Sequence, residues 1–137
     1  DIVLQIGGNA FSKCGYDPVE MRNRIRDYIP YINHVLIDMS GGNGKPLQTS
    51  LAIRCIEQLV QLNAFGQRII GIGAAGGLGP DNLDILAPIL AVYPYLSIDA
   101  ETMLVGRGER SGDEFVSESI RYLDSAQKLF NIKGNLK

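Results

Sequence analysis

The sequence has no tryptophan, a single histidine and only two cysteines among its 137 residues. Cys14 and Cys55 stand far apart, so they form neither a CxxC metal motif nor a disulfide framework, and their scarcity fits a reducing compartment. One histidine, His34, does not make a metal cluster, and its place at the start of an apolar run predicts a structural role. We therefore expect no metal site and no other cofactor.

The sequence also lacks an excess of charge of one sign. It has 13 Lys and Arg and 15 Asp and Glu, which gives a formal net charge of −2. This balance gives no basic surface for nucleic acid. The longest apolar runs, such as residues 69–72, are far shorter than the roughly 20 residues of a membrane span. We expect a cytoplasmic protein with no nucleic-acid or membrane partner.

What the sequence does contain is a regular alternation of short apolar runs and helical patterns. Runs of this kind are typical of parallel strands that are buried on both faces. The alternation predicts an α/β fold. The length of 137 residues and the 45% of apolar residues are enough for one domain with a buried core, over residues 1–137. Four such units suit a small open sheet, or half of a (β/α)8 barrel, which takes about 250 residues. The expected strands are residues 2–6, 34–38, 68–73 and 95–99.

Helix-start signals follow these strands. Asp17 and Pro18 predict an N-cap and a first turn. A second helix is expected from Thr49 or Ser50, and a third with Pro80 in its first turn, kinked or ended at Pro88. A last helix is expected to carry Phe115, Ile120, Leu123 and Phe130.

In both architectures a ligand meets the carboxyl ends of the strands. The most informative loop there is Gly76-Gly77-Leu78-Gly79-Pro80. Glycines let backbone amides approach a ligand, and a helix started by Pro80 would add its positive dipole end, so we expect a phosphate site at Gly76, Gly77 and Leu78. The alternative is a glycine-rich turn that only starts a helix.

Asp38 closes the second expected strand beside a second glycine-rich loop. A desolvated carboxylate there has a raised pKa and serves as a general acid or base. Alternatively, Asp38 only accepts hydrogen bonds from the loop of Gly41 and Gly42. Lys45 is a candidate partner for a phosphate, although a lone loop lysine is more often solvated.

Asp99 and Glu101 place two further carboxylates at the end of the fourth strand. They are candidates for holding sugar hydroxyls, a lysine or a divalent ion, or for capping the segment that follows.

A competing interpretation comes from Gly71, Gly73 and Gly76, which satisfy the G-x-G-x-x-G fingerprint of dinucleotide-binding domains. The expected helix start at Pro80 lies too late for this motif, and Asp99 is only loosely placed as the acidic residue that follows it. A small dinucleotide-binding domain therefore stays open as an alternative.

Taken together, residues 35–38 and 41–45 resemble the "LLD…GGxGK" strand and loop six of phosphoribosylanthranilate isomerase. Residues 75–83 resemble the "GGLxPxNV" phosphate loop after strand seven of that family. The resemblance implies that residues 2–6 are strand five and residues 96–99 are strand eight. It predicts four βα units that form the C-terminal half of a (β/α)8 barrel and lack strands one to four.

The resemblance also implies a function. Asp38 matches the general acid of an Amadori rearrangement of an aminoaldose to an aminoketose, and Gly76 and Gly77 match half of the phosphate cradle. The chain would bind a small phosphorylated sugar and need a missing half-barrel, or a second copy of itself, to close the barrel and be active. A non-catalytic module that binds a phosphorylated ligand or supports assembly on the same scaffold is the alternative.

Overall fold

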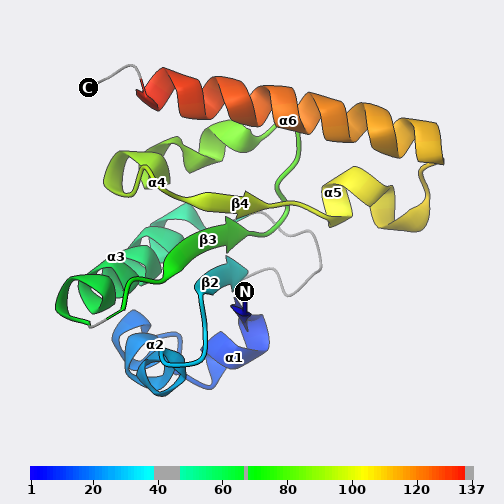
Figure 1. Cartoon of the computed structure of the whole chain (residues 1–137). Helices are drawn as coiled ribbons and strands as arrows, with labels where there is room; N and C mark the ends of the chain where they lie inside the picture. The colour runs from blue at the N-terminus through cyan, green and yellow to red at the C-terminus, as the bar shows by residue number, and fades with distance from the viewer. Residues whose placement is uncertain (39–46, 67, 135–137) are drawn as a thin grey trace.

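The computed structural model describes residues 1–38, 47–66 and 68–134. It contains a four-stranded sheet of β1 (Val3–Gly7), β2 (His34–Asp38), β3 (Gly71–Ala75) and β4 (Ser97–Asp99), in which every neighbouring pair is parallel (Figure 1). The spatial order β1-β2-β3-β4 follows the chain without a reversal. The α/β class and the parallel sheet are thus confirmed.

Helices connect the strands and pack side by side in chain order. Helix α2 contacts α3, α3 contacts α4, and α4 contacts α6. None of the described helices is long and apolar enough to cross a bilayer. The helical elements are α1 (Gly8–Ser12), α2 (Pro18–Ile25), η1 (Arg26–Tyr28), α3 (Thr49–Phe65), η2 (Leu83–Leu86), α4 (Ala87–Val92), α5 (Thr102–Val105), η3 (Gly106–Gly108) and α6 (Gly112–Gly134), where η marks a 3-10 helix.

The core lies between the helices and one face of the sheet. Side chains alternate between the two faces of a strand. Val35, Ile37 and Ile72 are at most 1% exposed and pack into the core, as do the neighbouring helices through residues such as Ile56 and Leu59. Full burial of such side chains contributes about 1.5–3 kcal/mol each.

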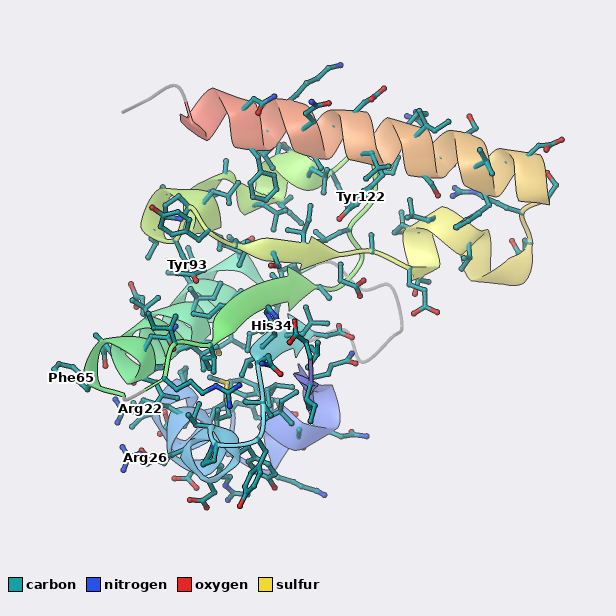
Figure 2. The ribbon with its side chains drawn as sticks, viewed as in Figure 1. Arg22, Arg26, His34, Phe65, Tyr93 and Tyr122 are labelled. Carbon is teal, nitrogen blue, oxygen red and sulfur yellow. The ribbon has the colours of Figure 1, made fainter. Side chains whose placement is uncertain are left out.

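The opposite face, which we call the open face, carries the alternate residues of each strand. Val3 is 55% exposed there, whereas Leu36 and His34 are half-buried. The His34 ring lies so close to β3 that a Cβ on Gly71 would come within 2.1 Å of its Nδ1 atom (Figure 2). Glycine in β3 therefore lets side chains of β2 lie across the neighbouring strand.

The strand predictions were right in number and order but not at every end. Strand β2 has the expected bounds, and β1 is displaced by one residue. Strand β3 begins only at Gly71, and β4 begins only at Ser97. Ile69, expected inside the third strand, is 82% exposed.

The helix predictions were right for α2 and α3. The Oδ1 atom of Asp17 accepts a hydrogen bond from the Val19 amide at 2.9 Å, and α3 begins at Thr49. The short helix α1, between β1 and α2, was not predicted.

The other helix predictions were partly wrong. Pro80 lies in a turn, and the helical chain begins three residues later at Leu83 as η2. Pro88 opens the α-helical part, α4, instead of ending it. The last helix, α6, is present as expected; its residues Phe115, Ile120 and Leu123 are 41%, 54% and 64% exposed, while Tyr122 is buried.

Candidate functional site

A pocket of about 110 Å³ lies at the carboxyl ends of the strands. Parallel pairing aligns Gly7 with Asp38, Asp38 with Ala75, and Ala75 with Asp99, so the ends of all four strands meet at one edge. The pocket brings together most of the residues that the sequence singled out. Those residues are Asp38, Gly76, Gly77, Leu78, Asp99 and Glu101.

Asp38 is the buried carboxylate of this site. It is only 5% exposed, although it lies at the carboxyl end of β2 beside the pocket. The Nε2 atom of Gln5 on β1 donates a hydrogen bond to its Oδ2 atom at 2.8 Å. A buried carboxylate that accepts hydrogen bonds is held in one orientation, which is what a proton donor or acceptor in a reaction needs.

The glycine-rich loop after β3 has a backbone that favours glycine. Gly76 and Gly77 have φ angles of +119° and +59°, values that L side chains rarely adopt. The Asn82 side chain clamps the loop: its Nδ2 atom donates to the Gly77 carbonyl at 2.7 Å, and its Oδ1 atom accepts from the Gly79 amide at 2.8 Å. Leu78, 1% exposed, anchors the loop in the core.

This geometry corrects one part of the predicted phosphate site. The helix after the loop begins at Leu83 as a 3-10 turn, so the dipole of a helix started by Pro80 is not directed at the pocket. The glycine backbone itself still lines the pocket.

The far wall of the pocket is acidic. Asp99 and Glu101 are exposed at the end of β4 and line it together with Asp38. No described lining residue carries a positive charge. Within the described residues, no group of three His, Cys, Asp or Glu side chains is arranged to hold a metal ion. Such a lining favours ligand groups that donate hydrogen bonds, such as hydroxyls.

Three predicted ligand residues, Gly41, Gly42 and Lys45, lie outside the described residues. The G-x-G-x-x-G pattern of Gly71, Gly73 and Gly76 does not lie in a turn between a strand and a helix, where a dinucleotide-binding fingerprint lies. Gly71 and Gly73 lie inside β3, and the motif does not form the turn that leads directly into a helix.

Sequence reasoning missed Gln5, Thr102 and Met103, which also line the pocket. Gln5 had a signal, because it is the one polar residue in the apolar run at residues 2–6. Thr102 and Met103 had none, since nothing in their local pattern marks a ligand site.

These features define an α/β protein with a consecutive parallel sheet and a small acidic pocket at its strand ends. No family model, curated protein or solved structure matches the chain.

Proposed function

We propose that the chain is the ligand-binding half of a sugar-phosphate isomerase-like (β/α)8 barrel. The observation that carries the proposal is the convergence of Asp38, Asp99, Glu101 and the Gly76-Gly77 backbone on one pocket. Carboxylates accept hydrogen bonds from sugar hydroxyls, and a glycine backbone admits a phosphate group without side-chain obstruction. The resemblance to phosphoribosylanthranilate isomerase supports the same assignment.

In this proposal Asp38 is the general acid that opens the sugar ring. Its burial and its hydrogen bond from Gln5 hold the carboxyl group in place beside the pocket. The reaction class is the conversion of an aminoaldose phosphate to an aminoketose phosphate, in which a proton is given to the ring oxygen and another is removed from the sugar carbon. The half-barrel that completes the site supplies the base for the second proton.

Binding is tested on the full chain with ribose 5-phosphate as the probe. We expect saturable changes in the NMR chemical shifts of the Gly76, Gly77 and Asp99 amides. Ribose should perturb Asp99 alone, and inorganic phosphate should perturb the glycines more weakly than the sugar phosphate does. The absence of saturable change at all three amides with ribose 5-phosphate contradicts the proposal.

Asp38→Asn separates catalysis from binding. In the completed barrel we expect kcat to fall about 100-fold or more, the usual contribution of a positioned acid, while the Kd for the sugar phosphate stays within about threefold. Asp84→Asn, the same change at an exposed carboxylate outside the pocket, should leave both constants unchanged. Unchanged turnover in Asp38→Asn would contradict the role of Asp38 as the acid, and a completed wild-type barrel that binds without turnover would favour the non-catalytic binding module.

Closure of the barrel by a second copy of the chain is the second part of the proposal. The support is that, among the described strands, β1 and β4 each pair on one side only, and that the open face is hollowed by about 300 Å³ between Val3, Leu36 and Ser97. Unpaired parallel edges and a partly apolar face are stabilised by continuing the sheet.

Sedimentation equilibrium tests this closure. We expect a mass of about twice 14.9 kDa, because four strands from each copy complete the eight of a barrel. Leu36→Glu, which places a charge on the open face, should shift the chain to monomer. Val92→Glu, at an exposed position on α4, should leave the dimer intact. A wild-type chain that stays monomeric at high concentration would rule out closure by a second copy.

A further inference from the structure

A groove of about 290 Å³ lies beside β1, the strand at one end of the described sheet, and side chains of α1 and α2 form its other wall. We call it the edge groove. Its lining is mostly apolar, with Ile6 from β1 and Met21 from α2 among the residues that form it. The charged side chains among its described lining residues, Lys13 and Arg24, are both basic. Gln5 is the one described residue that it shares with the pocket at the strand ends, so the groove is a separate feature of the fold.

Helix α6 lies at the opposite end of the helical layer from α2 (Figure 1). One side of α6 packs inward through Tyr122 and Leu129. On another side, Val116, Ile120 and Leu123 follow one another at intervals of four and three residues, the spacing of a single helix face. We call these three residues the α6 stripe, and each of them is more than half exposed. A helix with a second apolar side is typical of one that packs between two neighbours.

The fold itself shows where each helix lies relative to the next strand. Helix α3 follows β2, yet it contacts β3, the next strand of the sheet, and it packs between α2 and α4. By the same right-handed step, α6 should lie against the strand that continues the sheet beyond β4, and against the helix that follows that strand. In a barrel closed by two copies, that strand is β1 of the second copy and that helix is its α2. The edge groove of the second copy therefore lies where α6 is expected.

The charges on the two surfaces are complementary. Asp113 and Asp124 lie three or four residues from members of the α6 stripe, and therefore on the same side of the helix. Both are exposed, and neither forms an ion pair with a described residue. Lys13 likewise forms none among the described residues, whereas Arg24 is paired with Glu20 at 2.8 Å. Docking of the stripe in the groove brings an unpaired lysine close to two unpaired carboxylates.

We propose that the edge groove is the docking site for the α6 stripe of a second copy of the chain, so that each copy lays its last helix along β1 and α2 of the other. The apolar side chains of the stripe fill the groove, and Asp113 and Asp124 lie near Lys13. Each copy carries both surfaces, so two such contacts form around a twofold axis. This inference rests on the closure by a second copy proposed above, and it identifies the surfaces that join the two helical layers.

Sedimentation equilibrium of the full chain tests the stripe. Ile120→Lys, which places a cation against a basic groove, should weaken the dimer about tenfold or more in Kd. Lys128→Glu, at an exposed position on another side of α6, is the control and should leave Kd within about threefold. An Ile120→Lys dimer as tight as the wild type overturns the proposal.

Charge reversal tests the pairing. Lys13→Glu should weaken the dimer about fivefold, and Asp113→Lys combined with Asp124→Lys should do the same. All three reversals together exchange the signs of the two surfaces and should recover most of the lost affinity. Arg26→Glu, at an exposed cation outside the groove, is the control for Lys13→Glu and should leave Kd unchanged. Losses that simply add up in the triple variant contradict the charge complementarity.

Cysteine trapping locates the contact. Cys14 lines the edge groove, so a cysteine on the stripe should form a disulfide with the second copy under an added oxidant. We expect this of at least one of three variants, Val116→Cys, Ile120→Cys and Leu123→Cys. Lys128→Cys should give no cross-link, and adding Cys14→Ser to the stripe variants should remove it. A dimeric chain that cross-links at none of the three positions overturns the docking of α6.

The outcomes keep this proposal apart from the proposed function. A wild-type dimer that Ile120→Lys leaves intact and that gives no cross-link overturns the docking of α6 alone. A monomeric wild type overturns both the docking and the closure by a second copy, while ribose 5-phosphate binding, which is measured separately, still decides on the sugar-phosphate site.

Discussion

Replacing Asn63 by alanine should lower the free energy of unfolding by about 3 kcal/mol, because it leaves two buried backbone groups without partners. The Nδ2 atom of Asn63 donates to the Ile70 carbonyl at 2.8 Å, and its Oδ1 atom accepts from the Ile70 amide at 3.0 Å. Ile70 is fully buried. The Asn63 side chain thus makes the two hydrogen bonds that a neighbouring strand would make to Ile70. These bonds join the end of α3 to the residue before β3.

Urea unfolding of three variants measures this effect. Asn63→Asp keeps the acceptor for the Ile70 amide but sets a carboxylate oxygen against the Ile70 carbonyl, so it should not restore the stability lost in Asn63→Ala. Gln61→Ala changes an exposed residue on the same helix and should cost about 0.5 kcal/mol or less. If Asn63→Ala costs no more than Gln61→Ala, the two hydrogen bonds do not stabilise the fold as we infer.

The same contact explains why the third strand was predicted to begin too early. Ile69 and Ile70 continue the apolar pattern of the strand, so residues 68–70 were predicted as its beginning. In the fold the backbone of Ile70 pairs with a side chain, Asn63, instead of a neighbouring strand, and Ile69 points out at 82% exposure. A local pattern does not reveal a pairing between residues of different elements.

The helix after the glycine loop was misplaced for a related reason. Pro80 carries the usual signal of a first helical turn. The Asn82 side chain instead binds the backbone at Gly77 and Gly79, and the chain makes one more turn before it becomes helical at Leu83. Asparagine often forms such local bonds in turns, and here these bonds outweigh the helix-starting tendency of the proline.

The candidate site was predictable to the extent that it follows from parallel strands. Asp38 and Asp99 close strands whose ends align in register with Ala75, so the three strand ends share one edge. Gln5 reaches the pocket only because β1 pairs beside β2, and Met103 only because of how α5 packs. The site thus contains a part that topology determines and a part that only tertiary packing determines.

Alkaline pH should destabilise the chain through Cys55. The thiol is fully buried on α3, and burial raises its pKa from 9.0 to about 12. Below pH 9 the thiol is protonated in both the folded and the unfolded chain, so its contribution to stability is complete. Between pH 9 and about 12 the unfolded chain loses the proton first, and the free energy of unfolding falls by about 1 kcal/mol per pH unit.

Urea unfolding at several pH values between about 8 and 11 tests this slope. Cys55→Ala should start from a lower stability at pH 8, because it leaves a cavity, but its curve should be flatter above pH 9. Leu59→Ala removes a buried side chain on the same helix and has no titratable group, so it should lower stability equally at every pH. Tyr122 adds to the alkaline loss above pH 10 in all three chains, so only the difference between their curves reports on Cys55. Parallel curves for wild type and Cys55→Ala would mean that the thiol ionises as easily in the folded chain as in the unfolded one.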